Sequence, residues 1–200
     1  GVFYTNSASA ENVVFANHNK NYNTLQFYSG KISPFAGDMA ALGGLQDNGS
    51  LLYDGTPLSP NVMVSGGDGG YCYFDPNVQG AYISSVYENQ YRVFKNVNNT
   101  FYINQYQSGT FTSPFAVNFS RQVLYANAMT FEGSNVDKIL VINDFYGNYS
   151  GEQIDGQTGA EVPYSYMFVS PFTVSGDELY IGTSAGELFK LNIDGTVSDV

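Results

Sequence analysis

One short pattern recurs along the chain and constrains its fold more than any other feature. In each copy an apolar or aromatic pair is followed by two small or polar residues, a turn and a second apolar segment. Measured from Thr5 to Gly43, Ser84, Ala126 and Gly182, the copies are 38, 41, 42 and 56 residues apart. The spacing is irregular, but recurrence at about this length is typical of repeat architectures. The repeat predicts five hairpins, near residues 2–15, 40–53, 81–95, 123–142 and 179–191.

Within each copy the apolar residues alternate with a period of two, which predicts β-strands. Asn48-Gly49 lies between two apolar runs and predicts a tight hairpin turn. Blades of a β-propeller have four antiparallel strands in about 40 to 50 residues. We therefore expect an all-β chain in which residues 1–200 form a single segment of about four to five blade equivalents. A β-sandwich is the alternative fold, but it does not explain the recurring hairpin.

The triplet Ser-Pro-Phe marks the register of these units, because it precedes three of the hairpins. It occurs at residues 33–35, 113–115 and 170–172. Proline cannot donate to a strand ladder, so we expect each triplet to close one strand before the chain turns into the next. On this register the chain begins at the second strand of a blade and stops after the third strand of another. We therefore expect the chain to be part of a larger ring, with the remaining blades of the parent protein as partners.

Composition restricts the possible partners. Only 12% of the residues are charged, against roughly 25% in an average soluble domain, and 16% are aromatic. The formal net charge of −11, with seven Lys and Arg, argues against nucleic acid and an anionic membrane surface. No apolar run is long enough for membrane insertion. The single cysteine, Cys72, is expected to be a buried strand residue, because free cysteines are usually buried.

Two glycine-rich stretches carry a resemblance to known proteins. Residues 42–50 read Leu-Gly-Gly-Leu-Gln-Asp-Asn-Gly-Ser, and residues 64–70 read Val-Ser-Gly-Gly-Asp-Gly-Gly. They resemble sortilin-type and sialidase-repeat propellers, which include xyloglucanase-like glycosidases, and most of all long propeller proteins from bacteria with type IX secretion. The resemblance implies an extracellular or cell-surface location. The Trp-containing Asp box of this family is missing, because the chain has no Trp. Arg92 and Arg121 alone cannot form a sialidase arginine triad.

Asp47 and Asp68 are the best candidates for a catalytic pair, because glycoside hydrolysis needs two carboxyl groups. Both lie next to glycine-rich turns and could face a common groove. The alternative is that they bind backbone N–H groups, as aspartates at turns often do. The segment 66–70 lacks the Gly-Lys-Ser/Thr of a phosphate-binding loop. We therefore interpret it as a turn that needs positive φ and close backbone approach.

Other polar and aromatic residues are candidates for binding a ligand. Tyrosine offers an apolar ring with a hydrogen-bonding tip, which suits contact with sugars or protein loops. The candidate ligand-binding residues are Gln46, Asn48, Tyr87, Tyr91, Tyr102 and Tyr106, with Tyr146 and Tyr149 as further exposed tyrosines. At least half of these tyrosines are expected to pack between blades instead. No cofactor is expected, although loops containing Asp144, Asp155, Asp177 or Asp194 could supply oxygen ligands for calcium.

Three functions remain open from the sequence. The first is a non-catalytic extracellular module for adhesion or for binding a carbohydrate or protein ligand, favoured by the repeat, the low charge and the lack of a complete catalytic set. The second is a fragment of a secreted glycoside hydrolase of xyloglucanase-like type, with Asp47 and Asp68 as acid and base. The third is a structural component of a surface layer or filament.

Overall fold

The computed structural model describes residues 3–17, 25–104, 111–112, 114–128, 138–147, 149–155, 168–169, 179–182, 186–191 and 197–199. Within these ranges the regular secondary structure consists of β-strands, as the period-two pattern predicts. The all-β fold class is thus confirmed. None of the described residues forms a helix long and apolar enough to cross a membrane.

The described strands form a two-stranded hairpin and four four-stranded antiparallel sheets. In every sheet the strands are neighbours in the same order as in the chain. The N-terminal hairpin consists of β1 (Phe3–Tyr4) and β2 (Ala16–Asn17). Sheet 1 contains β3 (Phe27–Ile32), β4 (Ala41–Leu45), β5 (Gly49–Tyr53) and β6 (Val62–Ser65); sheet 2 contains β7 (Cys72–Phe74), β8 (Tyr82–Ser85), β9 (Gln90–Asn96) and β10 (Asn99–Asn104). Sheet 3 contains β11 (Phe115–Asn118), β12 (Val123–Ala128), β13 (Lys138–Asn143) and β14 (Ser150–Asp155); sheet 4 contains β15 (Phe168–Val169), β16 (Leu179–Gly182), β17 (Leu188–Leu191) and β18 (Val197–Asp199).

The recurring sequence pattern coincides with the second and third strands of each sheet. The antiparallel pairs β4–β5, β8–β9, β12–β13 and β16–β17 occupy four of the five segments in which the repeat predicts hairpins. In the first segment the pairing is short, with Phe3 opposite Asn17 and Tyr4 opposite Ala16. The second strand of the pair therefore follows the apolar run Val13-Val14-Phe15 instead of containing it.

The register expected at the C-terminal end is wrong. Strand β18 pairs with β17, so sheet 4 has a fourth strand and the chain does not stop after the third. The role expected of Ser-Pro-Phe holds at residues 33–35 but not at 113–115. Strand β3 ends at Ile32, directly before Ser33, whereas Phe115 is the first residue of β11. The second triplet therefore precedes a strand instead of closing one, and its phenylalanine is a core residue. The third copy, at 170–172, lies outside the described residues.

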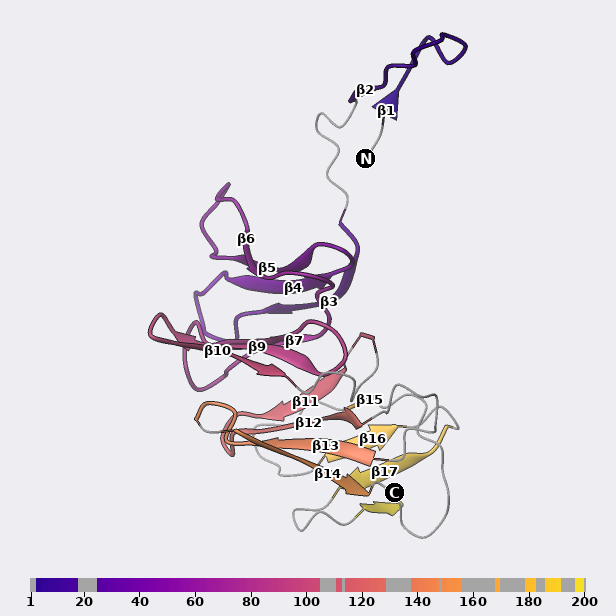
Figure 1. Ribbon diagram of the computed structural model, residues 1–200. Coiled ribbons are helices and arrows are strands. Elements are labelled where there is room, and N and C mark those ends of the chain that lie inside the picture. Colours follow the sequence, from indigo (N-terminus) through magenta and orange to yellow (C-terminus); the bar gives the residue numbers. More distant parts are fainter. Residues whose placement is uncertain are drawn as a thin grey trace.

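The four sheets follow one another in space in the order of the chain, and the N-terminal hairpin stands apart from them (Figure 1). In two of the three pairs of neighbouring sheets, the first strands lie close together. Strand β3 contacts β7, and β11 contacts β15. Among the described residues, sheet 2 shares one apolar core with sheet 1 and another with sheet 3.

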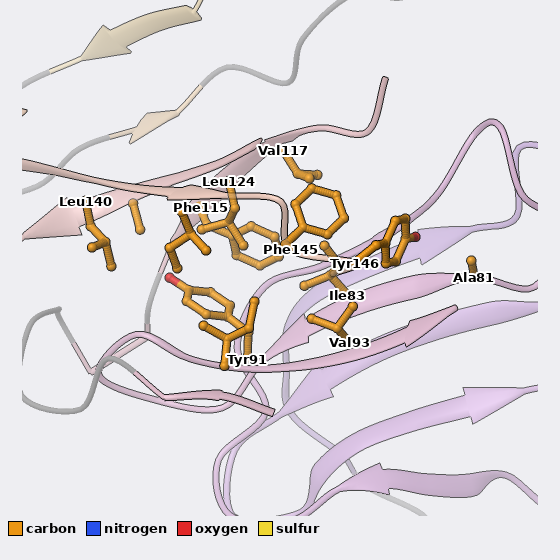
Figure 2. Packing of buried hydrophobic residues seen from close by; sticks show 13 residues of the cluster. Ala81, Ile83, Tyr91, Val93, Phe115, Val117, Leu124, Leu140, Phe145 and Tyr146 are labelled. Carbon is orange, nitrogen blue, oxygen red and sulfur yellow. The ribbon is translucent and has the colours of Figure 1, made fainter. Parts of the chain in front are cut away.

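The largest described core lies between sheets 2 and 3 (Figure 2). Phe115 is 1% exposed and makes edge-to-face contacts with Tyr73 and Tyr91, at 5.0 and 5.1 Å between ring centroids. Its fully buried neighbours come from both sheets and from the β13–β14 turn, which supplies Phe145. In the same turn the buried Tyr146 hydroxyl donates a hydrogen bond of 2.9 Å to Asp75, next to β7. Burial raises the pKa of Tyr146, so this cross-sheet bond persists at ordinary pH.

A smaller core joins sheets 1 and 2 and contains Leu42, Cys72, Phe74 and Tyr82. The prediction for Cys72 is confirmed, since this residue is fully buried in β7. Its thiol donates to the Leu42 carbonyl oxygen at 3.3 Å. Burial raises the pKa of the Cys72 thiol, and it raises the pKa of Tyr82 to about 12. These side chains consequently stay neutral and belong to the packing between the two sheets.

Candidate functional site

Three connecting segments meet at one end of sheets 1 and 2. They are the β4–β5 turn, the connector between β6 and β7, and the β8–β9 turn. The Asp47 backbone N–H donates a 2.7 Å hydrogen bond to a carboxylate oxygen of Asp68. A Cβ atom on Gly67 would lie 3.2 Å from Val86 and 3.3 Å from Tyr87. We call residues 46–48, 66–68 and 87–88 the turn edge.

Glycines allow these segments to approach one another. A Cβ atom on Gly44 would overlap the Gly70 carbonyl oxygen, and one on Gly69 would overlap the Gly49 carbonyl oxygen. Gly67 has a φ of 75°, in the left-handed region. The Gly49 N–H donates to the Gly67 carbonyl oxygen at 2.7 Å. The interpretation of 66–70 as a turn with positive φ and close backbone approach is therefore confirmed.

Asp47 and Asp68 do lie close together, but the Asp68 carboxylate is already engaged. One of its oxygens accepts the hydrogen bond from the Asp47 backbone, 21 residues earlier in the chain. Asp47 is exposed and has a φ of 59°, a strained conformation that most residues avoid. Asp68 thus satisfies the backbone of the turn and helps to hold Asp47 in that conformation. For Asp68 this agrees with the alternative stated for the pair, that aspartates at turns bind backbone N–H groups.

We expect the Asp68→Ala substitution to lower the free energy of unfolding by about 1 kcal/mol, because the Asp47 N–H then loses a charged acceptor. Urea denaturation measures this change. The Asp68→Asn variant keeps an acceptor oxygen and should lose less than half as much. Equal losses in the two variants would show that the hydrogen bond does not stabilise the turn.

Gln46 and Asn48 complete the β4–β5 turn. The Gln46 N–H donates to the Gln26 carbonyl oxygen at 3.0 Å, and the Asn48 side-chain amide donates to the Gln46 carbonyl oxygen at 2.7 Å. Gln46 is half-buried and Asn48 is exposed. The predicted hairpin turn is present, and its positive φ angles belong to Asp47 and Gly49, not to Asn48. Asn48 is nevertheless exposed at the turn edge, and its side-chain oxygen accepts no hydrogen bond from the described residues in this turn.

An aromatic pair lies beside these polar groups. The ring of the half-buried Tyr87 stacks on that of Phe111, with 6.5 Å between centroids and 17° between planes. Phe111 is 54% exposed. Sequence reasoning proposed Tyr87 but missed Phe111, which follows β10 by seven residues and is part of no apolar repeat. The stack adds a flat apolar surface to the turn edge.

Glu88 is a second residue that the sequence did not single out. The Gln90 N–H donates to the Tyr87 carbonyl oxygen at 3.0 Å, and the residues between them, Glu88 and Asn89, have φ angles of 50° and 58°. These values define a type I′ hairpin turn, in which Asn and Gly are the favoured residues. One Glu88 carboxylate oxygen is buried without a hydrogen-bond partner among the described residues. A glutamate in this left-handed position is unusual, and the half-buried side chain lies within the turn edge.

The other proposed tyrosines do not belong to the turn edge. Tyr91 is fully buried, and its hydroxyl donates to the Asn89 side chain at 2.7 Å. Its assignment to an exposed ligand-binding surface is therefore corrected: its ring fills the core between sheets 2 and 3. Tyr102 is 55% exposed on β10, with the Arg92 guanidinium 4.4 Å from its ring centroid. Tyr146 is buried and Tyr149 is half-buried against the same core, while Tyr106 lies outside the described residues.

The described residues contain no group of three or more His, Cys, Asp or Glu side chains that could hold a metal ion. Of the four aspartates considered for calcium, Asp144 is exposed in the β13–β14 turn with a φ of 51°. The Asp155 side chain and residues Asp177 and Asp194 lie outside the described part. Two other loop aspartates bind local groups: hydrogen bonds from the Ala40 N–H and Ser33 lower the pKa of Asp38, and bonds from Ser59 and the Thr56 N–H lower that of Asp54.

A comparison with protein families found no family model that matches this chain, and a search of curated proteins found no match either.

Proposed function

We propose that the four sheets are consecutive blades of a β-propeller and that the chain contributes part of its ring. Support comes from the order of the strands, since each sheet is a four-stranded antiparallel meander. The contacts of β3 with β7 and of β11 with β15 also support it, because the first strands of neighbouring blades line the centre of a propeller. The N-terminal hairpin then belongs to the blade that precedes sheet 1.

The function that we propose is binding of a carbohydrate ligand at the turn edge, in a non-catalytic extracellular or cell-surface module. The observation that carries the proposal is the meeting of exposed amide and carboxylate groups with the Tyr87–Phe111 stack. Sugars present hydroxyl groups around apolar C–H faces, so polar groups beside a flat aromatic surface suit them. The resemblance to secreted propellers favours the same location and ligand class.

A glycoside hydrolase is less well supported by the same residues. Hydrolysis needs one carboxyl group as acid and another as nucleophile or base, both free to face the substrate. The Asp68 carboxylate instead accepts the backbone N–H of Asp47. The two residues therefore act together as one structural unit, which favours binding over catalysis.

Affinity electrophoresis in gels containing xyloglucan tests the proposal. We expect the polysaccharide to retard the chain, and we expect Tyr87→Ala to weaken binding about tenfold, a loss of about 1.4 kcal/mol. Asn48→Ala should weaken it by a smaller factor, because it removes one exposed amide.

Tyr102→Ala and Asn98→Ala are the matched controls. Tyr102 is an exposed tyrosine on β10, and Asn98 is an exposed asparagine in the β9–β10 turn, so neither belongs to the turn edge. Both variants should keep the retardation of the unmodified chain. Equal loss in Tyr102→Ala would place the binding surface elsewhere, and migration unaffected by xyloglucan or other neutral polysaccharides would argue against carbohydrate binding.

A further inference from the structure

The face of sheet 1 that points away from sheet 2 is apolar and uncovered. Leu42 packs toward sheet 2, so its strand neighbour Gly43 faces the opposite side, where the Phe27 ring lies against it. The cross-strand partner of Gly43 is Leu51, which in turn lies opposite Met63. Phe27 is 55% exposed and Met63 is 60% exposed. We call this surface, formed by Phe27, Ile32, Gly43, Leu51, Tyr53 and Met63, the outer face.

The N-terminal hairpin carries a matching set of uncovered apolar side chains. Phe3, Val14 and Phe15 are 58%, 74% and 61% exposed, and Tyr4 is 50% exposed. Among the residues that the structure describes, β1 and β2 pair with each other and with no further strand. A two-stranded hairpin is at best marginally stable in water by itself. The hairpin therefore has exposed apolar surface of its own to bury.

The packing of the other sheets indicates which element should cover the outer face of sheet 1. Sheet 1 covers one face of sheet 2, and sheet 3 covers the other, so each face is covered by the preceding or the following sheet in the chain. The element that precedes sheet 1 is the N-terminal hairpin. Nine residues separate Asn17 of β2 from Phe27 of β3, against six between β6 and β7 and ten between β10 and β11. Nine residues span up to about 30 Å, and packed sheets are about 10 Å apart.

We propose that the N-terminal hairpin, residues 3–17, docks on the outer face of sheet 1 and continues the sheet-on-sheet packing by one layer. This inference rests on the blade interpretation given above, but not on carbohydrate binding. Docking places Phe15 against Phe27 and Met63, so apolar groups leave water on both surfaces. The same contact hides an exposed sheet face that would otherwise favour association between copies.

A single tryptophan tests the docking, because the chain has none. In the full chain carrying Phe15→Trp, the emission spectrum reports the surroundings of residue 15 alone. We expect a blue-shifted emission maximum and weak quenching by iodide. Adding Met63→Asp, which charges the outer face, should shift the maximum to that of an exposed indole and raise the quenching constant several-fold.

Val97→Asp in the same Phe15→Trp background is the control, since Val97 is an 86% exposed apolar residue in the β9–β10 turn of sheet 2. It should leave the emission unchanged. An exposed indole in the Phe15→Trp chain, insensitive to Met63→Asp, would overturn the proposal. A blue shift that disappears on dilution would also overturn it, because the outer face would then be covered by a second copy. Thermal unfolding of each variant verifies that the sheets remain folded. The emission and quenching measurements do not depend on carbohydrate binding, so a failure of that proposal would leave the docking test intact.

Discussion

Replacing Gly69 by alanine is expected to destabilise the chain by about 3 kcal/mol, the upper end of the usual range for overpacking, because a clash of backbone against backbone cannot be relieved by a rotamer change. The added methyl group would overlap the Gly49 carbonyl oxygen and would lie 2.8 Å from the Cα atom of Gly44. The connector would have to move away from sheet 1. That movement breaks the hydrogen bond from the Gly69 N–H to the Leu45 carbonyl oxygen, which is 2.8 Å long. Urea denaturation, with the midpoint and slope fitted together, measures the loss.

Gly66→Ala is the matched control, three residues earlier in the same connector. A Cβ atom there would meet no heavy atom within 4 Å, and no positive φ is required. Alanine also restricts the unfolded chain more than glycine does, so this variant should be unchanged or slightly more stable. If both variants lost the same stability, the close approach of the backbones would not be the cause.

The Phe115→Ala substitution is expected to cost about 3–5 kcal/mol, the usual range for removing a fully buried phenylalanine. Its ring contacts Tyr73 and Tyr91 of sheet 2 while its backbone belongs to sheet 3. The substitution therefore leaves a cavity in the largest described core and weakens the contact between two sheets. We expect a fall in the temperature of thermal unfolding together with loss of the near-ultraviolet circular dichroism of the packed tyrosines.

Phe111→Ala provides the comparison, because Phe111 lies four residues earlier and is 54% exposed. It should change the free energy of unfolding by less than about 1 kcal/mol, in keeping with exposed positions generally. It also removes the stacking partner of Tyr87, so on the proposed function it weakens carbohydrate binding without unfolding the chain. A stable Phe115→Ala variant would mean that sheets 2 and 3 do not share a core.

The sequence predicts the central hairpins of the sheets well, because a hairpin is encoded locally by alternating apolar residues around a turn. The β4–β5 and β8–β9 pairs illustrate this. Strands that are short or poor in such alternation are harder to assign. Strand β18, Val197–Asp199, has three residues and owes its place to pairing with β17, so its existence depends on the neighbouring strand more than on its own sequence.

The residues of the candidate site likewise divide into those that a local sequence pattern reveals and those that it does not. Gln46, Asn48 and Tyr87 could be proposed because polar and aromatic residues near turns are visible in the sequence. The Asp68–Asp47 hydrogen bond spans 21 residues, and no local pattern reveals it. Tyr91 and Tyr102 look alike in the sequence, yet one is fully buried and the other is 55% exposed, because their strands present them to different surroundings. Glu88 could have been noticed only as an unusual residue in a two-residue hairpin.

The sequential order of the sheets has a consequence for how stability is distributed. Each sheet is a complete meander formed by a continuous stretch of chain, and it gains its remaining contacts from adjacent sheets. Such an array behaves like a one-dimensional chain of coupled units, whose total stability is a sum of unit and interface terms. Sheets 2 and 3 share the largest described core, so a destabilising substitution in that core lowers the stability of both sheets. A substitution that stays within one sheet and outside the shared cores changes the stability of that unit alone, so tolerance of sequence change should follow the distance of a residue from the interfaces between sheets.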